Sequence, residues 1–293
     1  MTLVAFVSGR SPGLTTTVHA LSLTWPRLRT AIIAELDPDG GCIGVRQELA
    51  VEPGLTTLAA AGRRGLVPDV VLGHCQQLRD GAVALLAPVT PERTASALSV
   101  LGAQLGHALD AMAGVDVLAD CGRIDVRSPA LDLTRSARYV VFVLTPTLEG
   151  VAHCQGRVQA LGLAPGRAAV LTVGTRPYPP PEVGAALNLP VLGSVANDRH
   201  GADELAAGRV GRRSELLRSA QAVAERLAGR LAPVVPGDGP TPADFSSTAT
   251  SPPPAAAAAG RAPRWSPPPT STAGTSTGGS STAGPRRGQT RWP

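Results

Sequence analysis

The chain has 293 residues, of which 43% are apolar, 17% charged and 3% aromatic. This length is sufficient for one packed domain of roughly 200–250 residues and an additional segment. All 27 basic residues are arginines, which excludes any mechanism that needs a lysine ammonium group. No run of 18 apolar residues occurs, and the N-terminal residues lack the features of a secretory signal. We therefore expect a cytoplasmic protein with no transmembrane segment.

Short apolar segments rich in β-branched residues alternate with segments of helical periodicity over most of the chain. Strands are expected at 3–7, 31–36, 82–86, 115–119, 139–144, 168–173 and 191–192. Helices are expected at 15–25, 54–64, 92–112, 147–161, 181–188, 202–208 and 213–231. Apolar strands separated by helices are typical of a three-layer α/β fold, with a mostly parallel sheet and helices on both faces. In such folds ligands bind at the loops that follow the carboxyl ends of the strands.

The composition changes abruptly near residue 235, which predicts a domain over 1–235 and a separate tail over 236–293. The tail contains 12 prolines and 8 glycines, together with Ser/Thr runs and five consecutive alanines. Such a segment buries too little apolar surface to offset its ordering entropy, so we expect it to be disordered. Its five arginines and two aspartates carry +3 of the total charge of +5, which leaves +2 for the domain.

The loop after the first strand has the composition of a phosphate-binding loop. Residues 8–17 read Ser-Gly-Arg-Ser-Pro-Gly-Leu-Thr-Thr-Thr and lead into the first helix. Several backbone N–H groups and the positive end of the helix meet there, an arrangement that binds phosphate. A plain turn followed by a helix N-cap has a similar composition, so the loop alone does not decide between the two interpretations.

Polar motifs also follow the later strands, and their order is informative. They read Glu-Leu-Asp-Pro-Asp-Gly-Gly at 35–41, Glu-Pro-Gly-Leu-Thr at 52–56, Asp-Val-Leu-Ala-Asp at 116–120 and Val-Leu-Thr-Pro-Thr at 143–147. With the first loop, this series resembles the ParA/MinD family of deviant Walker ATPases over nearly all of 1–235. The resemblance implies a P-loop NTPase fold, ATP and Mg as ligands, and a homodimer.

The resemblance also implies roles for individual residues. The phosphate-binding positions would be Gly9, Arg10, Ser11, Gly13, Thr15 and Thr16. Thr15 would coordinate magnesium together with Asp120, which falls on the Walker B carboxylate. Asp37 would position the attacking water, and Glu35 stands where the family has another aspartate. Carboxylates and a hydroxyl near a phosphate loop have the chemistry to hold magnesium and orient water. Asp37 as an Asp-Pro turn and Asp120 as a strand-end cap are the structural alternatives.

The chain departs from the family at its two lysine positions. The family's loop reads Lys-Gly-Gly-x-Gly-Lys-Thr-Thr, whereas Gly9 occupies the signature lysine position and Leu14 the Walker lysine position. Arg10, one residue from the first of them, could reach a phosphate, although a guanidinium is broader than an ammonium. Without these cations the transferring phosphoryl group loses the charge stabilisation that dominates such catalysis. Hydrolysis is therefore expected to be absent or slow.

Three other segments bear on the function. The strand ending at Val173 is followed by Gly-Thr-Arg-Pro, where family members usually carry an asparagine that reads adenine. Arg123, after the Walker B strand, is expected to form a salt bridge with Asp125 rather than to bind a phosphate. The helix at 213–231 suits either packing on the sheet or a membrane surface, and its alanines and lack of an aromatic anchor favour packing.

Two functions are compatible with these patterns. The first is a degenerate scaffold, resembling the CpaE/TadZ-like members of pilus assembly systems, with protein partners at a secretion, pilus or division site and a peripheral location at the inner membrane. The second is a nucleotide-binding ATPase of chromosome or plasmid partitioning, with DNA as a partner. A domain charge of +2 is small for nonspecific DNA binding. The first function is therefore favoured.

Overall fold

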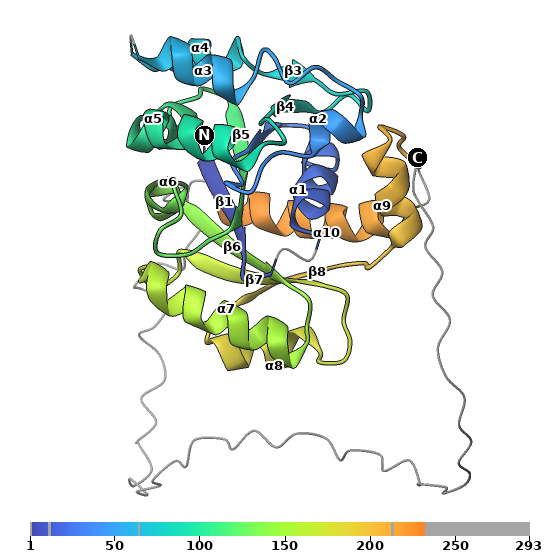
Figure 1. Ribbon diagram of the computed structural model, residues 1–293. Coiled ribbons are helices and arrows are strands. Elements are labelled where there is room, and N and C mark those ends of the chain that lie inside the picture. Colours follow the sequence, from blue (N-terminus) through green and yellow to red (C-terminus); the bar gives the residue numbers. More distant parts are fainter. Residues whose placement is uncertain (1, 11–12, 64, 212–213, 232–293) are drawn as a thin grey trace, which may run out of the picture. The chain divides into compact units, whose positions relative to one another are not determined.

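A computed structural model describes residues 2–10, 13–63, 65–211 and 214–231 (Figure 1). The chain divides into two units, Met1–Val234 and Val235–Pro293. The first unit corresponds to the expected domain. The second contains the expected tail and lies outside the described residues, so its predicted disorder stays a prediction.

One sheet of eight strands forms the centre of the described domain, in the order β3-β4-β2-β5-β1-β6-β7-β8. Neighbouring strands are parallel except for β3 and β4, which pair antiparallel. The strands are β1 (Thr2–Ser8), β2 (Thr30–Glu35), β3 (Gln76–Gln77), β4 (Val83–Leu85), β5 (Val115–Arg123), β6 (Tyr139–Leu144), β7 (Ala168–Val173) and β8 (Val191–Val195). All seven expected strands are confirmed, and β3 is an addition to them.

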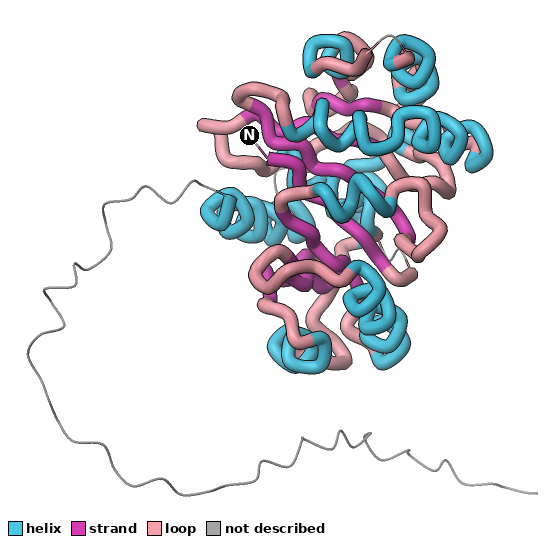
Figure 2. Tube along the Cα trace, turned by 90° about the vertical axis from the view of Figure 1, so that its left-hand side faces the viewer, coloured by secondary structure: helices cyan, strands magenta, loops and turns pink. Residues whose placement is uncertain are grey.

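Helices cover both faces of the sheet, as Figure 2 shows. They are α1 (Leu14–Leu23), α2 (Ile43–Arg46), α3 (Leu55–Gly62), α4 (Pro68–Leu72), α5 (Pro91–Asp110), α6 (Leu131–Ser136), α7 (Leu148–Leu161), α8 (Pro180–Leu187), α9 (Arg199–Ala206) and α10 (Glu215–Leu231). Residues from α3 to α8 pack on one face, and α1, α2, α9 and α10 on the other. The three-layer fold expected from the sequence is confirmed.

The central strand β1 explains the unbroken apolar runs in the sequence. Its residues are buried from end to end. Side chains alternate across the sheet, so Leu3 and Ala5 join the core under α5, whereas Val4 and Phe6 join the core under α1 and α10. The apolar side chains of α10 belong to the second core, which confirms the packing interpretation of this helix. Within the described residues no helix is long and apolar enough to cross a membrane.

A buried ion pair fastens α1 to the turn between β3 and β4. His19 Nε2 lies 2.9 Å from a carboxylate oxygen of Asp80, and the two side chains are 5% and 0% exposed. The carboxylate also accepts hydrogen bonds from the side chain of Gln47 at 2.6 Å and from the backbone N–H of Ala82 at 3.0 Å. Burial raises the pKa of Asp80, but the attraction of His19 and the hydrogen bonds outweigh it and bring the pKa below its ordinary value.

We predict that Asp80→Asn lowers the free energy of unfolding by about 1–3 kcal/mol at pH 7, because the buried imidazole of His19 then loses its carboxylate partner. The pKa of Asp80 is lower in the folded chain than its ordinary value of 3.8. The stabilisation is therefore present above that pH and is lost as the pH falls through the folded pKa. Urea unfolding of both proteins, followed by circular dichroism over a pH series, measures the difference.

Glu48→Gln is the matched control, since it breaks the neighbouring ion pair with Arg79, whose side chains are 79% and 48% exposed. An exposed pair contributes less than about 1 kcal/mol. Equal losses in the two variants would contradict the role given to the buried pair.

Candidate functional site

The candidate site lies where β1, β2 and β5 end, at the centre of the sheet. The chain leaves β1 at Ser8 and enters α1 after Gly13, whose left-handed backbone (φ 66°) favours glycine. The first turn of α1 contains no acidic residue, and Gly13 offers no side-chain cap. The free backbone N–H groups at the start of α1, which include those of Thr15 and Thr16, and the positive end of the helix therefore form a backbone cradle of the kind that holds phosphate. Ser11 lies outside the described residues.

The two expected magnesium ligands lie side by side. The hydroxyl of Thr15 donates a hydrogen bond of 2.6 Å to Asp120, which also accepts one of 3.1 Å from the N–H of Gly122. Asp120 is 2% exposed. Burial raises its pKa to about 7, and the nearby carboxylates of Asp37 and Glu35 add to the rise, whereas the Thr15 hydrogen bond opposes it. The fold thus brings the two residues together, and their role as magnesium ligands stays a prediction.

Glu35 has a structural role, because both oxygens of its carboxylate accept hydrogen bonds from the backbone. One carboxylate oxygen accepts from the N–H groups of Cys42 and Ile43 at 2.8 and 2.9 Å, and the other from the N–H of Ala87 at 3.1 Å. Burial raises its pKa in spite of these bonds. Glu35 therefore anchors the start of α2 and the end of β4. The family resemblance did not predict these contacts.

Asp37 lies near Asp120 and Gly122 in the candidate site, and it also forms the Asp-Pro turn that was its structural alternative. It accepts a hydrogen bond of 2.9 Å from the N–H of Asp39, which closes the Asp-Pro turn. A Cβ at residue 122 would lie 2.0 Å from the Asp37 carboxyl carbon, so this approach requires Gly122. Burial raises the pKa of Asp37. Among the described residues, no three His, Cys, Asp or Glu side chains are arranged to hold a metal ion on their own.

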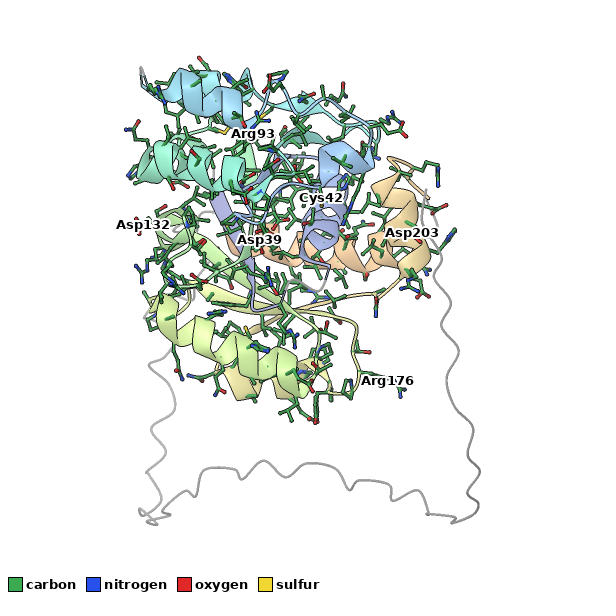
Figure 3. The ribbon with its side chains drawn as sticks, viewed as in Figure 1. Asp39, Cys42, Arg93, Asp132, Arg176 and Asp203 are labelled. Carbon is green, nitrogen blue, oxygen red and sulfur yellow. The ribbon has the colours of Figure 1, made fainter. Side chains whose placement is uncertain are left out.

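Arg123 corrects one expectation. It pairs with Asp39, whose carboxylate oxygen accepts from Arg123 Nε at 3.0 Å and from Nη2, and not with Asp125. Asp125 accepts the N–H of Arg127 instead, in a local turn. Figure 3 shows Asp39 near the centre of the domain, where the loop after β2 meets the loop after β5. Sequence proximity suggested the wrong partner because the two loops meet only in the folded sheet.

Both lysine positions of the family are closed in this chain. Leu14 is 3% exposed and belongs to the core under α1 and α10, so its side chain turns away from the loop. At Gly9 a Cβ would lie 2.9 Å from the Cβ of His153 and 3.0 Å from its carbonyl carbon, in the body of α7. At position 9, therefore, a longer side chain requires a rearrangement against α7. Arg10 is exposed and lines a cavity of about 300 Å³ between the loop and the start of α7.

A polar residue that the sequence motifs did not indicate lies beside Gly174, at the position where an adenine-binding asparagine was expected. Asn197, in the loop after β8, places its Cβ 3.7 Å from where a Cβ of Gly174 would lie. The two residues are far apart in sequence, and only the pairing of β7 with β8 brings them together. A carboxamide is thus available beside Gly174, although the motif itself lacks one.

No family model and no curated protein matches the sequence. Solved structures do match the domain. A ParA family ATPase from Chlorobium tepidum TLS is 14% identical with a TM-score of 0.63, over 77% of this chain and 98% of that one. The Pyrococcus furiosus cell division ATPase MinD is 17% identical with a TM-score of 0.62, over 79% and 99%. McdA from Cyanothece in an ATP complex is 15% identical with a TM-score of 0.59, over 78% and 96%.

The chain has the fold of the ParA/MinD ATPases. The residues of this ParA/MinD-like site fit ATP and magnesium only in part. The backbone cradle at Gly13 and the Thr15–Asp120 pair suit a phosphate with its metal ion. The buried Leu14 and the closed Gly9 position do not, because a polyphosphate there meets no lysine.

We predict that Gly9→Ala lowers the free energy of unfolding by about 1–3 kcal/mol, because the added methyl group meets α7. Gly156→Ala, on α7 itself, is the control: a Cβ there meets nothing within 4 Å, and alanine favours the helix by roughly 0.5–1 kcal/mol. Thermal unfolding of the two variants should shift in opposite directions. An unchanged or raised stability of the Gly9 variant would show that this position is open.

Proposed function

We propose that this chain is a degenerate ParA/MinD-like protein that acts as a positioning or assembly scaffold at a secretion, pilus or division site, and that it does not hydrolyse ATP efficiently. The observation that carries the proposal is the closure of both lysine positions, by the core at Leu14 and by α7 at Gly9. An ATPase whose sequence has diverged but that still hydrolyses ATP would need at least one of these cations to neutralise the transferring phosphoryl group.

The surrounding residues support loss of hydrolysis rather than its replacement. Glu35 has both carboxylate oxygens engaged by backbone N–H groups. Asp120 accepts one hydrogen bond at each carboxylate oxygen, from Thr15 and from the N–H of Gly122. The polar groups of the site therefore satisfy one another.

A scaffold needs partners, and one structural relative has a protein partner. MinD from Aquifex aeolicus, with a TM-score of 0.52, occurs in a complex with MinC. By analogy we infer that this chain binds proteins through its surface and tail, as a monomer or homodimer, peripherally at the inner membrane. An ATPase of chromosome or plasmid partitioning with DNA as partner is the second candidate, favoured by the retained Thr15–Asp120 pair and Asp37.

We predict that the purified full chain hydrolyses ATP with magnesium at least about 100-fold more slowly than a ParA/MinD ATPase that has both lysines, since loss of one such charge-stabilising group already costs about that factor. A coupled phosphate-release assay measures the rate. Asp37→Ala is the control, because it removes the water-positioning carboxylate. Steady turnover by the parent chain that disappears in this variant would refute the proposal.

We also predict that deletion of residues 236–293 leaves the melting temperature unchanged, because they lack periodic apolar residues that could join the core, and removes at least one protein partner. Thermal unfolding and affinity capture from the native cells compare the two forms. A large fall in melting temperature would disprove the domain boundary. Capture of no protein by either form, with tight and salt-sensitive binding to random duplex DNA, would favour the partitioning function instead.

A further inference from the structure

An exposed ion pair crosses the candidate site between two loops. Asp39 lies in the loop after β2, and Arg123 at the end of β5 donates to it from both Nε and Nη2. The side chains are 55% and 57% exposed. Such a pair contributes little to stability, so its opening is not costly.

The position of Arg123 relates it directly to the phosphate loop. In the parallel ladder Arg123 is paired with Ser8, the last residue before the loop, and Ile124 N–H donates to Ser8 O at 3.4 Å. The preceding residue, Gly122, contacts Asp37. The backbone of Arg123 therefore lies between the phosphate loop and Asp37.

Few cations are available at this point. Within the segments 8–10, 13–16, 35–42 and 120–124, which form the described part of the site, the basic side chains are Arg10 and Arg123. Arg10 lines the cavity on the α7 side of the loop. Arg123 lies on the β5 side, with Asp37, and its charge acts to lower the pKa of that aspartate. Arg46, outside these segments, acts in the same direction on Glu35, so Arg123 is the arginine that acts on the carboxylate of Asp37.

We propose that Arg123 supplies the phosphate-binding cation that positions 9 and 14 lack, and that Asp39 acts as a latch that holds Arg123 until a phosphate-bearing ligand displaces it. This inference rests on the proposed function in one respect, that the loop binds phosphate without efficient hydrolysis. Guanidinium–phosphate hydrogen bonds are charge-assisted and often bidentate, so a phosphate competes well with a single exposed carboxylate oxygen. For this exchange the long, exposed side chain of Arg123 needs only to change rotamer.

A double-mutant cycle on the full chain tests the latch, with affinity measured by isothermal titration calorimetry. The probes are ATP with magnesium, ADP with magnesium, and inorganic pyrophosphate, which separate a nucleotide from phosphate alone. Arg123→Gln should weaken binding about tenfold, as expected for a lost hydrogen bond between charged groups. Asp39→Asn should strengthen binding about twofold to fivefold in the parent chain, the factor that corresponds to an exposed ion pair, and have no effect in the Arg123→Gln background.

Two controls make the result specific. Glu48→Gln releases Arg79 from an equally exposed pair elsewhere and should leave affinity unchanged. Melting curves confirm that the variants fold, which their exposed side chains favour. If Asp39→Asn strengthened binding equally in both backgrounds, Asp39 would act by simple repulsion and the latch would be wrong. An unchanged affinity of Arg123→Gln, or no binding of any probe to any of the four proteins, would also overturn it.

The proposed function and the latch fail in different ways. ATP turnover in the same samples contradicts the loss of hydrolysis, whatever the cycle shows. Failure of the cycle, without turnover, removes the latch and leaves the scaffold proposal intact.

Discussion

The site depends on how the buried carboxylate of Asp120 is neutralised at the end of β5. A carboxylate with 2% exposure in the centre of a sheet needs a cation, a proton or several hydrogen bonds. Thr15 and the N–H of Gly122 provide hydrogen bonds to it, and burial raises its pKa to about 7. The same constraint explains why Glu35 is held by three backbone N–H groups.

Positions 9 and 14, where the family has lysines, do not carry arginine in this chain, and packing gives the reason. The Walker position lies at the start of α1 above a closely packed core, where an apolar side chain gains burial that a guanidinium would lose. The signature position lies against α7, where even a Cβ is too close. Two arginines of the described part of the site, Arg10 and Arg123, lie beside these positions, where their side chains reach solvent.

The sequence was sufficient for the fold, and it indicated two residues that the fold brings into contact. Buried strands such as β1 have no polar alternation, so the apolar runs located every strand except the two-residue β3. The helices α2, α4 and α6 were missed because elements of four to six residues are too short to show a period. The Thr15–Asp120 pair followed from motif order. The Arg123–Asp39 pair, the contact of Gly9 with α7 and the place of Asn197 did not, because each joins segments that only the sheet brings together.

Stability and catalysis make opposite demands on a site of this kind. A lysine beside a phosphate loop must remain partly desolvated and unpaired until the ligand binds, and such preorganised charge lowers the stability of the free protein. Leu14 in the core and Gly9 against α7 carry no such cost. The sheet and its two cores, not the phosphate loop, hold the described domain together. The proposed loss of hydrolysis would therefore leave the fold and its surface unchanged.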